Sequence, residues 1–446
     1  MKKILLLIAG FAIVSCTNEP KVDYALFSGK ITNPKGEKVV VTGEDFEKEI
    51  TLNEDGTFAD TLRVDTGYYT VFHGRNRSPL FVAQGHDLTM TTDGQMFIDS
   101  LSFKGNGANE NNYLVGKLAA NKDFKFQEVY ASEEAEFMKI INEKKAKAED
   151  ALQVVKELSA DFVNLEKSYI NYEYLADLSR YPMYHAYYAK KEDYKASEEI
   201  LKPLNDLNYD NANDFKNFEP YKQIVLGHYM QNMYQDSLAA QTLKEIQNLQ
   251  SQNIKNELAA ELVYTISPSN ENVEEIYNTI NAISDDNDLK EKVTEKYNKV
   301  KELATGKVSP TFEYENHKGG TTSLKDLEGK YVYIDVWATW CGPCIGEIPS
   351  LKKVEEEYHD KNIEFVSISI DQKNAYETWR KMVEDKELGG IQLMADNAWQ
   401  SKFVTDYAIE GIPRFILIDP QGNIVNADAP RPSSPKLIEL FNELKI

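Results

Sequence analysis

The chain has 446 residues, a length that predicts two or three domains. Hydrophobic residues make up 42% and charged residues 27% of it, as is ordinary for globular proteins. A net charge of -22 at pH 7 argues against nucleic acid or an anionic membrane surface as a binding partner. With three cysteines, the chain is not a disulfide-rich scaffold.

Residues 1–16 have the pattern of a secretory signal peptide. Lys2 and Lys3 precede an apolar run over residues 4–14, which is about half of the length that spans a bilayer. The run ends in Ile-Val-Ser-Cys, which resembles the bacterial lipobox and implies that Cys16 is acylated and becomes the first mature residue. An ordinary signal peptide with a chance cysteine is the alternative.

The residue after the lipobox bears on location in the cell envelope. Thr17 follows Cys16, whereas an aspartate there would retain a lipoprotein in the inner membrane. The run of acidic residues that marks surface export in some phyla is absent as well. We therefore expect a lipid anchor in the outer membrane and a protein body that faces the periplasm.

The next two stretches differ in their hydrophobic pattern. Residues 17–107 are predicted to form a small β-sandwich, because short runs rich in Val, Thr, Phe and Tyr alternate with turn signals. Residues 108–305 are predicted to be all-α, since apolar residues recur there at helical spacing. The prolines in this stretch, Pro182 among them, are expected to separate its helices. We expect a spacer or docking module.

Tyrosines are dense between Tyr169 and Tyr194. A groove lined by them would suit a peptide or a sugar, because each side chain combines a rigid apolar body with a polar tip. The alternative is that they pack between helices with their hydroxyl groups in water.

Residues 306–446 carry the clearest chemical motif. An apolar run over residues 331–336 predicts a strand, and a helical pattern begins at Ile345, directly after the pair Cys341 and Cys344. Two cysteines with two residues between them at a strand-to-helix junction are typical of a redox dithiol.

The chemistry depends on that spacing. At the helix N-terminus, free amide groups and the helix dipole favour a thiolate at Cys341, the expected exposed nucleophile. Cys344 lies one turn further, close enough to attack a mixed disulfide. Between them stand Gly342 and Pro343, and a proline suits the first helical turn because its missing N–H would have no partner there.

Two other uses of such a cysteine pair are a zinc half-site and a structural disulfide. A structural zinc site needs a second ligand pair, and the six histidines supply no His-x(3–5)-His pattern. A disulfide across two residues would restrain little of the unfolded chain. We therefore expect no metal and no cofactor other than the Cys341–Cys344 dithiol itself.

At these residues the chain resembles the thioredoxin superfamily, which implies an α/β thioredoxin-like fold for residues 306–446. Asp335 stands where that superfamily keeps a buried carboxylate that handles the proton of the inner thiol, here Cys344. The Ile412-Pro413 pair resembles the family's cis-proline loop, and cis X–Pro bonds are uncommon. The resemblance implies that the Ile412 backbone pairs with an extended substrate segment beside the dithiol.

Three features narrow the resemblance to the TlpA/ResA branch of membrane-tethered thiol-disulfide oxidoreductases. They are a predicted hairpin within residues 311–330, Glu347 after the dithiol and a helical insertion at about 376–407. The resemblance covers residues 308–446. Peroxiredoxins share the hairpin but have a proline seven residues before their cysteine, where this chain has Ile334. The β-stretch resembles the N-terminal domain of related lipoproteins of Bacteroidetes.

Four further residues bear on the dithiol. Trp337 and Trp340 are expected to form an apolar shoulder that excludes water, and packing around the loop is a compatible alternative. Glu347 matches an acidic position that tunes the dithiol in the TlpA/ResA branch, although a surface carboxylate at a helix start is the alternative. Ser367 stands where thioredoxin has a lysine, so the pKa of a buried Asp335 should be raised.

We expect a thiol-disulfide oxidoreductase that reduces protein disulfides, because a Gly-Pro pair between the cysteines goes with the reducing relatives. Its expected partners are disulfide-containing proteins and a membrane thiol-disulfide electron donor. Two alternatives stay open. One is a disulfide isomerase or oxidase with the same dithiol, and the other is a glycan- or peptide-binding lipoprotein whose redox domain is vestigial.

Overall fold

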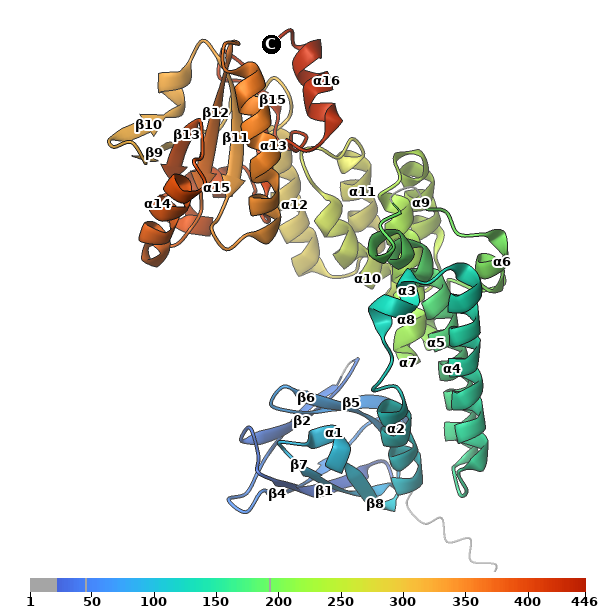
Figure 1. Ribbon diagram of the computed structural model, residues 1–446. Coiled ribbons are helices and arrows are strands. Elements are labelled where there is room, and N and C mark those ends of the chain that lie inside the picture. Colours follow the sequence, from blue (N-terminus) through green and yellow to red (C-terminus); the bar gives the residue numbers. More distant parts are fainter. Residues whose placement is uncertain (1–21, 45, 192–193) are drawn as a thin grey trace, which may run out of the picture. The chain divides into compact units, whose positions relative to one another are not determined.

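The computed structural model describes residues 22–44, 46–191 and 194–446. The expected signal peptide and the lipid-attachment residue Cys16 lie outside these ranges. The chain divides into two compact units, the first ending at Gly227 and the second beginning at His228. Figure 1 shows the helices and strands of the chain, coloured along the sequence. In the described part of the chain, no helix combines the length and apolar character needed to cross a membrane. The domain boundaries expected at residues 107 and 305 stay predictions.

The first unit begins with two four-stranded sheets, in the orders β4-β1-β7-β8 and β3-β2-β5-β6. One hydrophobic core joins them, because alternate strand residues such as Phe27, Val41 and Val71 are buried in a shared cluster. The predicted β-sandwich is therefore confirmed. Its strands are β1 Ala25–Thr32, β2 Lys38–Gly43, β3 Phe46–Thr51, β4 Thr57–Leu62, β5 Gly67–His73, β6 Asn76–Val82, β7 Asp87–Asp93 and β8 Ser102–Asn106.

Helices follow the sandwich, as expected. They are α1 Phe97–Ser100 within the sandwich, then α2 Ala108–Ala120, α3 Phe126–Ala131, α4 Glu134–Val154, α5 Ala160–Tyr188, α6 Glu198–Leu201, α7 Ala212–Asn217, α8 Glu219–Met233, α9 Asp236–Asn248, α10 Gln252–Leu262, α11 Val273–Ile283 and α12 Asn287–Glu302. Short 3-10 turns lie at Lys202–Leu204 and Val263–Thr265.

The prediction that Pro182 separates two helices is wrong, because α5 continues through it for 29 residues. A proline inside a helix costs about 3 kcal/mol. Here the flanking Tyr181 and His185 are fully buried, and the Tyr181 ring lies 4.1 Å from that of Phe137 on α4. This tertiary packing offsets the local cost.

Most tyrosines of the dense segment contact neighbouring helices. Tyr172 donates a hydrogen bond to Asp214 and Tyr194 donates one to Glu134, each at 2.5 Å. Tyr187 differs, since it is 75% exposed. The contacts favour packing between helices over a tyrosine-lined binding groove.

A buried ion pair joins the sandwich to the helices of the first unit. The fully buried Glu166 on α5 accepts hydrogen bonds from Lys117 on α2 at 2.8 Å and from Tyr68 on β5 at 2.5 Å. Tyr113 on α2 donates to the same carboxylate at 3.2 Å, and Lys117 also pairs with Glu173 at 2.7 Å. The carboxylate therefore holds a strand and two helices together.

Glu166→Ala is expected to destabilise the first unit by about 3–5 kcal/mol, because it leaves Lys117 buried with one partner fewer. Thermal unfolding followed by circular dichroism would measure the loss. The four tryptophans all lie in the second unit, so their fluorescence should report an unchanged transition. Glu128→Ala is the control, since that side chain is 72% exposed and its loss should cost almost nothing. Equal melting of the two variants would contradict the assignment.

The second unit ends in a seven-stranded sheet of order β10-β9-β13-β12-β11-β14-β15. Its strands are β9 Glu313–Asn316, β10 Thr321–Ser323, β11 Tyr331–Trp337, β12 Ile363–Ser369, β13 Ile391–Met394, β14 Arg414–Ile418 and β15 Ile424–Asn426. Its helices are α13 Gly342–Tyr358, α14 Tyr376–Asp385, α15 Lys402–Asp406 and α16 Pro435–Glu443, with 3-10 turns at Leu324–Leu327, Lys373–Ala375 and Ala398–Gln400.

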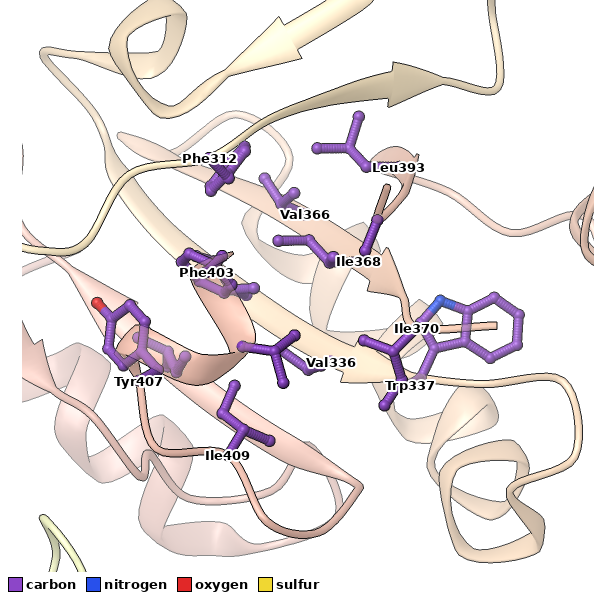
Figure 2. Close-up of a cluster of buried hydrophobic side chains, with 14 of the residues drawn as sticks. Phe312, Val336, Trp337, Val366, Ile368, Ile370, Leu393, Phe403, Tyr407 and Ile409 are labelled. Carbon is purple, nitrogen blue, oxygen red and sulfur yellow. The ribbon is translucent and has the colours of Figure 1, made fainter. Parts of the chain in front are cut away.

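Both faces of this sheet are covered. On one face α13 and α16 pack Leu351 and Phe441 against Tyr333 of β11. On the other face α14 and α15 bury Trp379 and Phe403 in a second cluster, part of which is shown in Figure 2. The central strand β11 is consequently an almost continuous buried run, as parallel sheets between two helical layers require.

The predicted thioredoxin-like α/β fold is confirmed, including the β9–β10 hairpin. The expected helical insertion at about 376–407 is partly wrong, because it contains β13. This strand pairs parallel with β12 and antiparallel with β9. Its four residues, Ile-Gln-Leu-Met, are too few to show a strand period, so only the neighbouring strands reveal it.

Candidate active site

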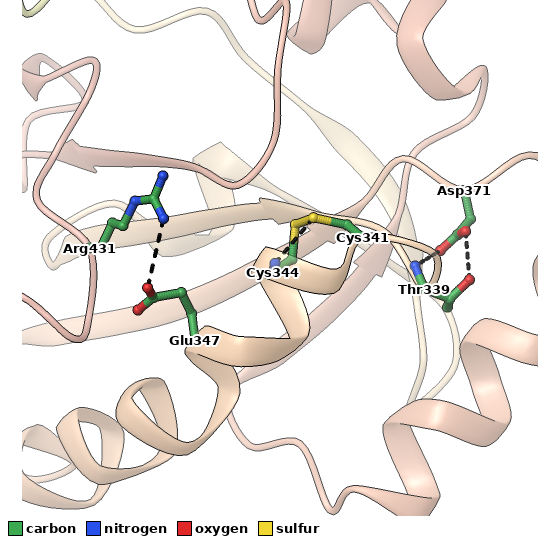
Figure 3. The surroundings of a disulfide bond; sticks show 6 residues. All are labelled: Thr339, Cys341, Cys344, Glu347, Asp371 and Arg431. Atoms are coloured by element: carbon green, nitrogen blue, oxygen red, sulfur yellow. Dashed lines mark hydrogen bonds and ion pairs between the residues drawn. A yellow bond between two sulfur atoms is a disulfide. The ribbon is translucent and has the colours of Figure 1, made fainter. Parts of the chain in front are cut away.

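The two cysteines of the motif form a disulfide at the start of α13, directly after β11 and a short loop (Figure 3). Cys341 is the N-cap residue, and its sulfur accepts a hydrogen bond from the Cys344 N–H at 3.1 Å. Gly342 and Pro343 occupy the first turn, as the sequence predicts. The helix dipole therefore points its positive end at Cys341, which favours a thiolate in the reduced protein.

The expected contrast between an exposed Cys341 and a buried Cys344 is not present. Cys341 is 4% and Cys344 3% exposed, and both sulfur-bearing residues belong to the core cluster on the α14 side of the sheet. The reason is that the disulfide holds the outer sulfur against the first turn of the helix.

The loop before the dithiol is fixed by a residue that the sequence did not single out. Asp371 is 1% exposed and accepts hydrogen bonds from the Thr339 N–H at 2.9 Å and from the Thr339 hydroxyl at 2.8 Å (Figure 3). The Ser369 hydroxyl donates to it at 2.8 Å. A polar residue just past the carboxyl end of a buried parallel strand is the signal that could have identified it.

The predicted cis bond between Ile412 and Pro413 is present. Pro413 precedes β14, which pairs antiparallel with β11 so that Arg414 lies opposite Val336. This register brings Pro413 to the same edge of the sheet as the dithiol loop. The part played by the Ile412 backbone in substrate pairing stays a prediction.

Asp335 is buried in the middle of the sheet behind the dithiol. It lies on β11 between Ser367 of β12 and Phe415 of β14, and it is 8% exposed. Its Oδ1 atom has no hydrogen-bond partner among the described residues. Burial, followed by the nearby charges of Glu355 and Glu347, raises the pKa of Asp335 to about 8, the direction expected for a carboxyl without a lysine beside it.

Asp335→Asn is expected to stabilise the oxidised domain, and more at pH 9 than at pH 5. Because the folded protein keeps a proton that the unfolded chain releases above pH ~4, stability falls as pH rises toward about 8. At about 1.4 kcal/mol per pKa unit, and with allowance for relaxation around the charged form, we expect a gain of about 3 kcal/mol above pH 8. Denaturant unfolding followed by tryptophan fluorescence measures it.

Asp360→Asn is the matched control, because that side chain is 86% exposed and its removal should leave the curve of stability against pH unchanged. A curve for Asp335→Asn that runs parallel to that of the native protein from pH 5 to 9 would show that Asp335 does not titrate in this range.

Glu347 on α13 ties the helix to the segment before α16. Its carboxylate accepts hydrogen bonds from the N–H and the hydroxyl of Ser433 at 3.0 and 2.9 Å, and Arg431 lies at 4.0 Å (Figure 3). The side chain is 12% exposed. It is therefore a bound carboxylate rather than a free surface one, and tuning of the dithiol stays a prediction.

The two tryptophans expected to form a shoulder lie in different environments. Trp337 is 2% exposed and belongs to the core, as the alternative of packing around the loop implies. Trp340 is 60% exposed, and its ring lies 6.5 Å from that of Trp399. The apolar surface beside the dithiol is made by Trp340 and Trp399, which the fold brings together across 59 residues of sequence.

Among the described residues, no group of three or more His, Cys, Asp or Glu side chains is placed to hold a metal ion. The redox-active atoms that the site itself provides are the two sulfur atoms of Cys341 and Cys344.

Comparison with known proteins points to the same class. Residues 304–438 match the Redoxin family. The thiol-disulfide oxidoreductase ResA of a Bacillus cereus strain is 29% identical over 124 residues, which are 28% of this chain and 68% of ResA. ResA of Halalkalibacterium halodurans is 27% identical over 139 residues, 31% of this chain and 76% of that protein.

Solved structures resemble about a third of the chain. A solution structure from Bacteroides vulgatus, of a protein assigned as a thiol-disulfide oxidoreductase, is 52% identical and covers 30% of this chain and 86% of that one, with a TM-score of 0.28. A thiol-disulfide oxidoreductase from Bacteroides fragilis is 29% identical and covers 30% of this chain and 99% of that one, also at 0.28.

The C-terminal part of the chain is thus a redoxin domain with a thioredoxin-like fold. The protein is a thioredoxin-like thiol-disulfide oxidoreductase with ResA-type relatives.

Proposed function

We propose that this oxidoreductase is a lipid-anchored reductant of protein disulfides in the periplasm and that Cys341 and Cys344 carry the reaction. The observation that supports it best is the disulfide at the N-cap of α13, with a buried carboxyl group of raised pKa on the preceding strand and an exposed tryptophan beside it. Such a site can take two electrons from a donor and deliver them to a client disulfide.

The reaction begins with the Cys341 thiolate, which attacks one sulfur of the client disulfide. The client S–S bond breaks, its second sulfur leaves as a thiolate, and a mixed disulfide forms. Cys344 then loses its proton and attacks the Cys341 sulfur, which releases the second client thiolate and forms the Cys341–Cys344 disulfide. Two electrons have passed to the client, and a membrane thiol-disulfide donor restores the dithiol.

Asp335 is the group proposed to accept the proton of Cys344. Proton transfer is efficient when donor and acceptor have similar pKa values. The raised pKa of Asp335, about 8, is close to that of an ordinary thiol at about 8.5, whereas a carboxyl near pKa ~4 would be a poor acceptor. Burial of this side chain is therefore what makes it suitable for the task.

The direction of electron flow is tested by the equilibrium reduction potential of residues 17–446, measured in glutathione and then dithiothreitol buffers. We expect a potential well below that of glutathione, because the Gly342-Pro343 pair resembles that of reducing relatives. Trp340 fluorescence supplies the signal, and Cys344→Ser should abolish the transition. A potential well above that of glutathione would instead identify an isomerase or oxidase.

The lipid anchor is tested on the full chain in a bacterial host with an outer membrane. Cys16→Ser should move the protein from the membrane fraction to the soluble periplasmic fraction, because it removes the thiol that carries the acyl chains. Thr17→Ser is the control and should stay with the membrane. Retention of the Cys16→Ser protein in the membrane fraction would contradict the proposed anchor.

A further inference from the structure

A second carboxyl group lies behind the dithiol and has no part in the chemistry described so far. Glu355 is on α13, the helix that begins at Cys341, and it lies about four turns further along. Its carboxylate raises the pKa of Asp335, and more strongly than Glu347 does. The two carboxyl groups therefore feel each other's charge although they come from different elements.

Asp335 and Glu355 line one small cavity inside the domain. Its volume of about 10 Å³ is close to the space that a single water molecule requires. The side chains in its wall that carry polar atoms are those of Asp335, Trp337, Lys352, Glu355, Ser367 and Gln392, and apolar residues close the rest. A water molecule in this cavity would have several hydrogen-bond partners among these polar side chains.

Three residues of the cavity wall carry an unpaired polar atom. Asp335 Oδ1, Gln392 Oε1 and Trp337 Nε1 are buried without a hydrogen-bond partner among the described residues. Unpaired buried polar atoms are costly and uncommon, so a polar cavity lined by three such residues is a site for water.

The other side of Glu355 opens to solvent. It lines a second, wide hollow on the surface together with Pro349, Lys352, Lys353, Glu356, Glu387 and Gly389. Three residues line both the inner cavity and the outer hollow, namely Lys352, Glu355 and Gly389. Of these three, Glu355 is the one that can accept and release a proton near neutral pH.

The chain keeps room for this carboxylate. A Cβ atom on Gly389 would lie 2.3 Å from Glu355 Oε2, and one on Gly390 would lie 3.0 Å from Oε1. The tight turn before β13 therefore presses its backbone directly against the Glu355 carboxyl group. A side chain at Gly389 would displace the Glu355 carboxyl group from its position between the inner cavity and the outer hollow.

We propose that Glu355 is the outer member of a proton relay, which takes the proton of Cys344 from Asp335 through one water molecule and releases it to solvent. This inference rests on the proposed roles of Cys344 and Asp335. In the relay the proton leaves the Cys344 thiol for the Asp335 carboxylate, crosses the cavity water to the Glu355 carboxylate and departs through the outer hollow. No electrons move along this path.

The charges around Glu355 suit that task. Burial raises its pKa to about 7, and Lys352 opposes the shift. The charged groups that line the cavity and the outer hollow with it are Asp335 from β11, Lys352, Lys353 and Glu356 from α13, and Glu387 from the turn before β13. The pKa of Glu355 is about 7 and that of Asp335 about 8, so the transfer of the proton to Glu355 is only slightly uphill, and its release to solvent near neutral pH completes the step.

The test uses Glu355→Gln in the reduced body of residues 17–446, which keeps the size of the side chain and removes its titration. Oxidised glutathione is the probe, and stopped-flow tryptophan fluorescence follows the release of glutathione by Cys344 from pH 5 to 9. We expect this step to slow by about tenfold near pH 7, less than the loss of a general base itself would cause, because Asp335 can still accept the proton. Its pH midpoint should fall, because the charge next to Asp335 is gone.

Two further variants separate the relay from a structural role. Glu357→Gln removes an exposed carboxylate of the same helix that lines neither cavity, and it should leave rate and midpoint unchanged. Glu355→Asp keeps a titrating group and should restore part of the rate. An unshifted pH profile for Glu355→Gln would overturn the relay.

Failure of the relay and failure of the proposed dithiol chemistry give different results. Cys344→Ser should accumulate a mixed disulfide between Cys341 and glutathione, which mass spectrometry detects. If the mixed disulfide accumulates but Glu355→Gln behaves like the native protein, only the relay is wrong. If the mixed disulfide never accumulates, the proposed roles of both cysteines are wrong, and so is the relay that depends on them.

Discussion

The hydrogen bonding of β11 on both of its edges is the constraint on which the redox domain depends. β12 pairs with it in parallel and β14 pairs with it antiparallel, so three separate segments end at one edge of the sheet. The dithiol loop follows β11, Asp371 follows β12 and Pro413 precedes β14. These residues are far apart in the sequence, and their common position is a property of the sheet rather than of any one segment.

The same strand also accounts for the unusual acid behind the dithiol. Since helices cover both faces of the sheet, a carboxyl group on β11 has little contact with water, and its charged form is disfavoured. Burial also raises the pKa of Glu355 on α13, the second carboxyl group. A charged group kept in such a place reduces stability, and proteins retain that kind of cost mainly at functional sites. The dithiol and its two carboxyl groups thus form one arrangement, organised by burial.

The first unit contrasts with this pattern. Its buried charges, Glu166 and Lys117, satisfy each other and the tyrosines around them. Such a network holds elements together and leaves no group free for chemistry. The disulfide itself lies in the second unit, and the role of the helical region as a spacer or docking module stays a prediction.

The sequence by itself determined the dithiol at a strand-to-helix junction, because that follows from local spacing, and its resemblance to the thioredoxin superfamily implied the class of fold, the cis bond before Pro413 and the burial of Asp335. Only the tertiary structure decided what depends on distant contacts. It placed β13 in a segment predicted to be helical, carried α5 through Pro182, buried Cys341 and Trp337, and brought Asp371 and Glu355 to the site. The physical reason is that burial and pairing are decided by neighbours across the fold, whereas local sequence sets only the preferences that those neighbours can override.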